Sequence, residues 1–420
     1  MRHTPLYNRQ SKAKKTAAVS TLNPLALAAA LVAIPATQAA AQTDVSLILD
    51  AYHKSDQTAL GGRSEGFGLS HSELSITQSM GEHLRGKLTA VADINEDDSE
   101  FELEEAYLQT LTLPAGLTVK AGRFLADIGY LNSQHSHSDS FTERPLAYRG
   151  FLGGHYFDDG LGLSITLPTQ LYWQVNAGIF TGDEFADRNS DNSLGIWTLS
   201  SKIGGDIGTE HSWQAGFSYV RNRTIDDAHD EHHHNDHDEE HEEDHDEEHD
   251  DHSDEHDADH DDHGHDDHDD GGHHGHSHGA EYTGKNIYIA DVVWKWAPQG
   301  NNRQQQLKLA GEYIRVTDIN EYAGSSDYHS GYYLSAVYRF LPEWSVGVRH
   351  GELDVKNPHG DHFHAADISE TSVMVAWNPT HTQTVRLQYT EQDGNGFEDD
   401  DNAITLQYQI GFGSHAAHGF

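Results

Sequence analysis

Histidine, aspartate and glutamate make up almost all of one long segment of this sequence, residues 226–279. The segment holds 18 His, 18 Asp and 8 Glu, and it contains no lysine or arginine. Neutral imidazole and carboxylate groups suit zinc, copper and nickel, and several rings can reach one ion when the chain folds around it. We therefore predict many weak, interchangeable metal sites in this segment. The candidate ligands are His229, His232, His233, His234, His237, His241, His245, His249, His252, His256, His260, His263, His265, His268, His273, His274, His276 and His278.

The same segment cannot form a hydrophobic core. Its only apolar residues are Ala228 and Ala258, so burial cannot offset the entropy of ordering, and we expect disorder over residues 223–284 in the absence of a ligand. A passive acidic loop that repels other surfaces is the alternative. Repulsion and solubility need no imidazole, so eighteen histidines favour metal capture.

Two other polar connections carry better spaced candidate ligands. Residues 356–367 bring together His359, Asp361, His362 and His364. The longer connection 128–157 carries His135 and His137, followed by further acids and by a third histidine. Exposed histidines are common in loops and need not meet, so each set is only a hypothesis for an ordered metal site.

The beginning of the sequence resembles a secretory signal peptide. Basic residues precede a ten-residue apolar run at 25–34, which is too short to span a bilayer, and three small residues follow at 39–41. We predict a signal peptide over residues 1–41. Cysteine is absent, which excludes thiolate metal sites. Most of the net charge of −43 comes from residues 226–279, and no basic footprint for nucleic acid is present.

Outside the acidic segment, apolar and polar residues alternate with period two. Residues 213–219 (WQAGFSY) and 331–340 (GYYLSAVYRF) are examples, and about sixteen such segments can be counted. They begin near residues 44, 67, 86, 102, 117, 161, 171, 194, 211, 285, 304, 329, 343, 369, 383 and 402. Because successive side chains of a strand point to opposite faces, each segment is predicted to be a strand with one apolar face.

Short and long connections alternate between these segments. Short turns on one side, long loops on the other and strands of about ten residues are typical of an outer-membrane barrel. A soluble all-β protein also has alternating strands, but the signal peptide and the apolar C-terminal strand, with Phe412 and the terminal Phe420 of one parity, favour the membrane. We predict an all-β transmembrane antiparallel barrel of about sixteen strands over residues 42–420, in the cell outer membrane, with residues 223–284 as an extracellular loop.

Sixteen strands enclose a lumen wide enough for water. In barrels of this size the third long loop often folds inward, so His135 and His137 could line a constriction. Several charged residues fall on the lumen face, and we interpret them as solvated charges of the channel wall. They are Lys120, Lys308, Glu312, Arg339, Arg349 and Arg386.

Three stretches resemble a proteobacterial outer-membrane family: residues 104–111 (EEAYLQTL), 116–124 (GLTVKAGRF) and 128–137 (IGYLNSQHSH). Its members are labelled zinc-regulated or TonB-dependent outer-membrane receptors, and they carry a His/Asp-rich loop and an ending like residues 413–420. The resemblance implies zinc acquisition. The sequence departs from TonB-dependent receptors because the first strand begins near Val45, which leaves no room for an N-terminal plug domain. In organisation it is closer to a general or phosphate-type porin.

These observations lead to one functional hypothesis and two alternatives. We expect a porin-like channel that captures divalent metal ions, zinc before copper or nickel, and admits them through the barrel. The alternatives are a surface barrel that buffers metal without transport, and a general anion porin with an incidental acidic loop. The expected partners are the metal ions, outer-membrane lipid and the barrel-assembly machinery, with a homotrimer or a monomer as the assembly. No arrangement of a positioned nucleophile is present, so we predict no enzymatic activity.

Overall fold

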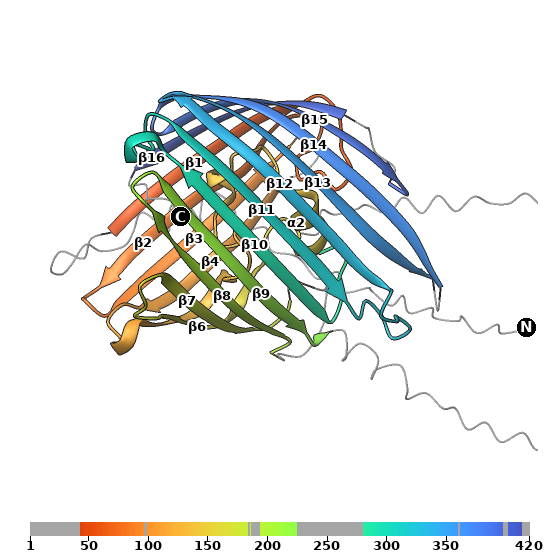
Figure 1. The fold of residues 1–420 in the computed structure, drawn as a ribbon, viewed down its shortest axis with the longest axis horizontal. Coiled ribbons are helices and arrows are strands. Elements are labelled where there is room, and N and C mark those ends of the chain that lie inside the picture. The colour runs from red at the N-terminus through yellow and green to blue at the C-terminus, as the bar shows by residue number, and fades with distance from the viewer. Residues whose placement is uncertain are drawn as a thin grey trace, which may run out of the picture. The chain divides into compact units, whose positions relative to one another are not determined.

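The structure is a computed structural model, and it describes residues 43–95, 99–183, 185, 194–224, 280–359, 362–397 and 402–413. The described residues form sixteen antiparallel strands in one closed barrel, in which β16 pairs with β1 (Figure 1). The strands are β1 (Thr43–Lys54), β2 (Gly66–Met80), β3 (Leu84–Ile94), β4 (Ser99–Thr110), β5 (Leu117–Leu125), β6 (Phe157–Thr166), β7 (Tyr172–Phe180), β8 (Ile196–Ile207), β9 (His211–Asn222), β10 (Asn286–Trp296), β11 (Gln306–Thr317), β12 (Tyr328–Leu341), β13 (Trp344–His359), β14 (His362–Thr380), β15 (Gln383–Asn395) and β16 (Asn402–Gly413).

The exterior of the barrel is apolar and its lumen is polar. On β16, Ile404, Leu406 and Tyr408 are exposed on the outer surface, whereas Thr405 and Gln407 between them are buried. Closure pairs the strands around the whole ring and leaves no open edge, as hydrocarbon requires, and the alternation places the apolar side chains against lipid. The chain is an outer-membrane β-barrel, as the alternation of the sequence predicts.

The observed strands begin within a few residues of the predicted positions, with one exception. β14 begins at His362 rather than near residue 369, and β13 continues to His359. The prediction of a loop over residues 356–367 is therefore wrong: its described residues form the end of a β13–β14 hairpin, paired as far as His359 and His362. The alternation continues because Val355 and Ile368 are buried in the main hydrophobic core.

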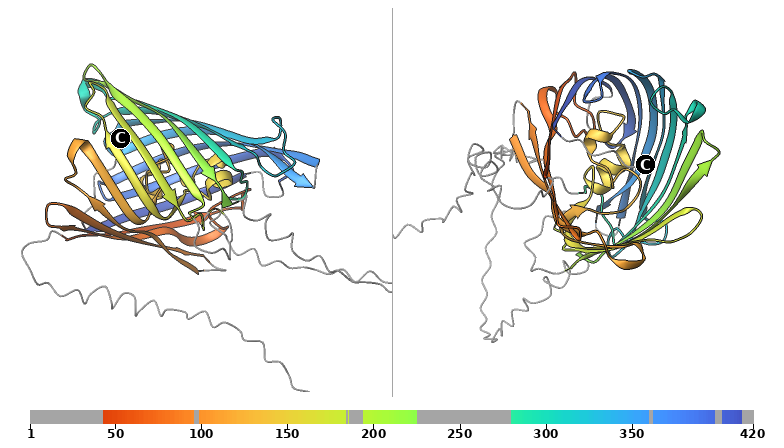
Figure 2. Two further views of the ribbon diagram at one scale, coloured as in Figure 1. Left: turned by 90° about the horizontal axis from the view of Figure 1, so that it is seen from below. Right: turned by 90° about the vertical axis from the view of Figure 1, so that its left-hand side faces the viewer.

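The connection between β5 and β6, residues 126–156, enters the barrel, and we call it the inward loop. It contains the helix α2 (Leu146–Leu152), all of whose residues are buried, and the short 3-10 helix η2 (Ser136–Ser138). Viewed into the barrel, it lies inside the ring of strands (Figure 2). The prediction that this loop folds inward is confirmed. Among the described residues, no helix is long and apolar enough to cross a membrane.

One buried carboxylate of the barrel wall organises the start of the inward loop. Glu312 on β11 accepts hydrogen bonds from the main-chain N–H of Tyr130 (2.8 Å) and from the hydroxyls of Tyr148 (2.8 Å) and Tyr333 (2.9 Å). Gly129 lies beside them at φ +57°, where a Cβ would lie 2.5 Å from the hydroxyl oxygen of Tyr148. The close approach and the left-handed backbone both require glycine at this position.

A buried network of five charged residues holds the rest of the inward loop, and we call it the anchor network. Glu143 of the loop pairs with Lys54 (3.0 Å) and with Arg149 of α2 (3.2 Å). Glu370 on β14 then pairs with Arg149 and, at 2.9 Å, with Arg349 on β13. All five side chains are nine-tenths or more buried, so the loop is held to β1 and to the β13–β14 wall.

The interpretation of the wall charges as solvated is wrong for Glu312, which the inward loop covers as described above, and for two wall arginines. Arg349 donates to the main-chain oxygen of Glu143 at 2.6 Å, and Arg386 donates to that of Asp139 at 2.9 Å. Both guanidinium groups are buried, because the inward loop covers them. They position the loop and are withdrawn from the solute path.

The anchor network should keep the inward loop docked far into the acidic range. Burial raises the pKa of Glu143, but Lys54 and Arg149 lower it more, to about 2. A carboxyl whose folded pKa is depressed contributes stability above its unfolded value of 4.5, and loses it as the pH falls towards 2. Single-channel conductance should therefore stay constant from pH 7 to about 4.5 and become unstable as the pH approaches 2. In Glu143→Gln, the instability should already be present at pH 7; stable conductance of that variant would contradict the assignment.

Candidate functional site

The inward loop separates two hollows in the lumen. The inner hollow, of 930 Å³, lies towards the short turns and is lined by Arg85, Lys87 and Asp206 among others. The outer hollow, of 490 Å³, lies towards the long loops and is lined by Arg63 and Glu281 among others. Histidines line both hollows, so the candidate metal ligands lie on the two sides of the boundary between them.

Glu104 on β4 is shared by histidines of both hollows. Its Oε1 lies 2.7 Å from Nε2 of His155 and 3.5 Å from Nε2 of His71, two residues that line the outer hollow. Its Oε2 lies 3.0 Å from Nδ1 of His135, which lines the inner hollow. The Glu104 side chain is only 1% exposed, so one buried carboxylate stands between the two hollows.

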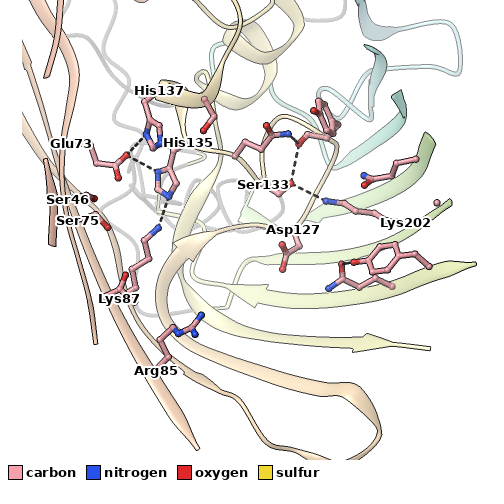
Figure 3. Close-up of a pocket in the computed structure, with 18 of the residues that line it drawn as sticks. Ser46, Glu73, Ser75, Arg85, Lys87, Asp127, Ser133, His135, His137 and Lys202 are labelled. Atoms are coloured by element: carbon pink, nitrogen blue, oxygen red, sulfur yellow. Dashed lines mark hydrogen bonds and ion pairs between the residues drawn. The ribbon is translucent and has the colours of Figure 1, made fainter. Parts of the chain in front are cut away.

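The inner group surrounds His135, as Figure 3 shows for most of its members. Nδ1 of His135 is 3.3 Å from Glu73, whose carboxylate is also 3.0 Å from Nδ1 of His137. Nε2 of His135 is 3.1 Å from Glu105 and 2.9 Å from the ammonium of Lys87. The rings of His135 and His137 stack with centroids 5.6 Å apart. Both histidines belong to the inward loop and line the inner hollow; that they line a constriction of the pore stays a prediction.

Two β-bulges direct the carboxylate and imidazole side chains of the site into the lumen. β4 has one residue more than β3 at Glu104: Thr89 pairs with Glu105 and Ala90 with Leu103. Regular alternation would send one of two consecutive glutamates into lipid, and the bulge turns both inward, where they are 1% and 4% exposed. Bulges re-aim side chains in this way and are frequent beside functional sites.

The second bulge lies in β2. Between Leu69 and Ser72 this strand also has one residue more than β3, and His71 there adopts φ +43°. A non-glycine residue in the left-handed region costs about 1–3 kcal/mol and persists only where its surroundings hold it. Asp93 does so by accepting the His71 N–H at 2.7 Å. The change of phase lets Phe67 face outward while Glu73, of the same parity, faces the lumen.

His155 comes to the site from the end of the inward loop. Asn132 closes the base of the loop: its Oδ1 accepts the N–H of Tyr156 at 2.6 Å, and its amide donates to the main-chain oxygens of Ala126 and Tyr156. This places His155, the neighbour of Tyr156, with its ring edge-on to His71 at a centroid distance of 5.3 Å. Asn132 thereby joins the two ends of the loop to each other.

The electrostatics differ between His135 and His155, two of the three histidines of the inward loop. Burial lowers the pKa of His135, but Glu104 and Glu105 raise it more, to about 10, so this ring is a cation among carboxylates. The neighbouring ammonium of Lys87 opposes that protonation, and the carboxylates outweigh it. Burial lowers the pKa of His155 by more than Glu104 raises it, so that ring is neutral. A metal ion at His135 would replace its proton.

Two sets of side chains have the composition and spacing to hold a metal ion. Within each set, one ligand atom per residue lies within 4.8 Å of the others. The inner set is Glu73, Glu104 and His135, and the outer set is His71, Glu104 and His155. Imidazole with carboxylate is a donor set used by zinc and other divalent transition metals.

Of the residues predicted as metal ligands, the structure brings His135 and His137 together. His362 and His364 are exposed on β14, and neither lines the inner or the outer hollow. The backbone of His359 pairs with that of His362, but its side chain is not described. Asp361 and the eighteen histidines of residues 226–279 lie outside the described residues.

Sequence reasoning missed His71, Glu73, Glu104 and Glu105. The first two lie in a strand whose phase changes at a bulge, which a fixed period of two cannot reveal. The adjacent pair Glu104 and Glu105 did carry a signal: on a regular membrane strand, one of them would face lipid. That conflict could have predicted the bulge in β4.

Sequence comparison finds one relative of this chain among curated proteins at this level of similarity. No protein-family model matches the chain. An uncharacterized protein of Aquifex aeolicus (strain VF5) is 26% identical over 387 residues, which cover 84% of this chain and 70% of that protein.

Solved outer-membrane proteins share the architecture. A loop L8 deletion mutant of OmpT from Vibrio cholerae gives a TM-score of 0.52 at 9% identity, covering 89% of this chain and 100% of that one. OmpF of Salmonella typhi, solved with daunomycin, gives 0.52 at 13% identity, covering 89% and 98%. The channel DcaP of Acinetobacter baumannii gives 0.51 at 12% identity, covering 90% and 99%. The protein thus has the fold of the outer-membrane porins.

Proposed function

We propose that this protein is an outer-membrane channel that captures divalent metal ions, zinc before copper or nickel, and admits them past the inward loop. The observation that carries the proposal is the inner set, Glu73, Glu104 and His135, at the constriction between the two hollows. Carboxylates concentrate cations at a pore, and imidazole adds the preference for transition metals over calcium and magnesium. The ions are cargo, so no resident cofactor is implied.

The histidine-rich segment supports the same proposal from the outside. Residues 226–279 join β9 to β10, and Ala280 and Glu281, which follow directly, line the outer hollow. The main-chain N–H of Tyr282 donates to the main-chain oxygen of Gly150 in α2 at 2.9 Å. The segment would therefore load ions near the mouth of the hollow, from which they reach the inward loop. The role in zinc acquisition that the sequence resemblance implies is part of this proposal.

The anion-porin alternative is less well supported. An anion channel needs cationic groups that face the solute, and Arg85 and Lys202 do line the inner hollow. Arg149, Arg349 and Arg386, however, are buried and bound to carboxylate, amide or main-chain oxygens. Lys87 lines the inner hollow but lies 2.5 Å from Glu105. In a planar bilayer we expect cation preference; an anion preference would favour the alternative.

Removal of residues 226–279 tests the capture step. In liposomes that contain a zinc indicator, the deletion should lower zinc entry roughly tenfold at low zinc, because the segment raises the local ion concentration. At saturating zinc, the two proteins should differ little. A deletion in which an uncharged linker of the same length replaces the segment controls for the change in loop length. Equal entry at low zinc would contradict capture by the segment, and a barrel that binds zinc without any entry would identify a surface buffer.

A further inference from the structure

The outer set contains three buried ligand atoms that have no hydrogen-bond partner. Nε2 of His71, Nε2 of His155 and Oε1 of Glu104 are each almost completely inaccessible, and none makes a hydrogen bond. The 2.7 Å approach of His155 to Glu104 lacks hydrogen-bond geometry. A buried polar group without a partner costs about 1–3 kcal/mol. Three such atoms that face one another are a costly arrangement for a folded protein, unless something binds between them.

The spacing and chemistry of these atoms fit a divalent transition metal. In a tetrahedral zinc site, ligand atoms bound at about 2.0–2.1 Å lie about 3.3 Å apart. The separations here are 2.7 Å from Glu104 to His155 and 3.5 Å to His71. Two imidazoles and one carboxylate are the protein ligands of many three-ligand zinc sites, which leave the fourth position open. Here, His71 and His155 also line the outer hollow, which gives an ion a route of entry.

The backbone geometry of the outer set also supports a metal-binding role. His71 reaches the site only through its bulge and its φ of +43°, and Glu104 is itself the extra residue of the bulge in β4. Both side chains that come from the wall are therefore placed by local departures from regular strand geometry. His155 comes from the inward loop, so an ion held here would also join the loop to the wall.

We infer that His71, His155 and Glu104 form a binding site for a divalent transition-metal ion at the floor of the outer hollow, and that Glu104 hands the ion to Glu73 and His135 on the inner side. The transfer rests on the proposed function; the site itself does not. Oε1 of Glu104 faces the outer histidines and Oε2 faces His135. An ion can move from one oxygen to the other without leaving the carboxylate, so one residue serves both sets.

The site can be tested by binding alone, in a background that isolates it. Residues 226–279 are deleted and His135→Ala removes the inner imidazole, which leaves the outer set as the ordered candidate among the described residues. Zinc binding to this detergent-solubilised barrel is measured by calorimetry, and cobalt binding by its visible absorption. We expect one saturable ion per barrel, and His155→Ala should weaken binding at least roughly tenfold, since even loss of a residue that only supports a ligand has a 10–100-fold effect.

His350→Ala is the matched control, because His350 is a partly exposed histidine of β13 outside both sets, and it should leave the affinity unchanged. His155→Gln, which is close in size, serves if the alanine variant does not fold, as judged by heat-modifiable migration on gels. Absence of zinc binding in the background protein, or equal affinity after His155→Ala and His155→Gln, would overturn the inference. Binding that responds as expected in a barrel without zinc entry would retain the site and refute the proposed transport.

Discussion

Glu104→Gln is expected to lower zinc entry into liposomes at least roughly tenfold at low zinc, while potassium conductance changes little. The substitution preserves the size of the side chain but removes the charge that both ligand sets share. Loss of one ligand from a three-ligand set costs at least as much as the 10–100-fold effect of a supporting residue. Because both sets lose a ligand together, the effect should exceed that of His135→Ala or His155→Ala alone.

The matched control for this variant is Glu102→Gln. Glu102 precedes Glu104 by two residues on β4 and lines the outer hollow, but it belongs to neither ligand set. Glu102→Gln removes the same charge from the lumen but leaves both ligand sets intact. If both variants slow zinc entry equally, the effect comes from the general potential of the lumen, and Glu104 has no special role.

Glu370→Ala should have the largest effect on the inward loop. Glu370 pairs with Arg149 of α2 and with Arg349 of β13, and all three side chains are at most 5% exposed. Removing one partner of a buried ion pair costs about 3–5 kcal/mol, because the remaining charge is left buried and unpaired. Here two guanidinium groups lose their partner. The loop should leave its position, and single-channel conductance should rise and become noisy.

Glu352→Ala provides the control for the loss of a carboxylate. Glu352 lies on the neighbouring strand β13 and is about half exposed, so its removal should leave conductance steady. Thermal unfolding followed by circular dichroism separates release of the loop from failure of the barrel, since the strand signal should persist in Glu370→Ala. An unchanged conductance in Glu370→Ala would show that the anchor network does not hold the loop.

Much of the barrel could be predicted from the sequence because a membrane strand obeys a simple rule. Lipid on one side and water on the other force the alternation that Ile404, Leu406 and Tyr408 display on β16. The same reasoning located nearly all strand starts and the inward fold of the loop that carries His135. It failed at the β13–β14 hairpin, where the Pro, Gly and His content of residues 356–364 indicates a loop, although burial of Val355 keeps the strand going.

The candidate site was harder to predict because it is built from exceptions to that rule. His71 and Glu104 occupy bulges, whose positions depend on pairing with β3 rather than on the residues themselves. His155 meets them only because Asn132 closes the inward loop at its base. Sequence spacing favoured neighbours such as His135 and His137, whereas the ligand sets join residues of β2, β4 and the loop that are far apart in the chain.

Under the proposed function, the two hollows, the loop between them and the shared carboxylate define the path of the ion. An ion that enters the outer hollow would meet His71 and His155, and His135 and Glu73 line the inner hollow beyond them. Glu104 contacts both sides. The anchor network fixes the loop that carries two of these histidines, so the proposed metal selection would depend on the same segment as the pore geometry.

Anomalous diffraction at the zinc edge tests the central claim most directly. Crystals of the barrel without residues 226–279, soaked in zinc, should show an anomalous peak within about 2.0–2.2 Å of a carboxylate oxygen of Glu104 and of a nitrogen of His155 or His135. The same soak of Glu104→Gln should lack the peak. Zinc found only on the outer surface of the barrel, with the lumen around Glu104 empty, would contradict the account.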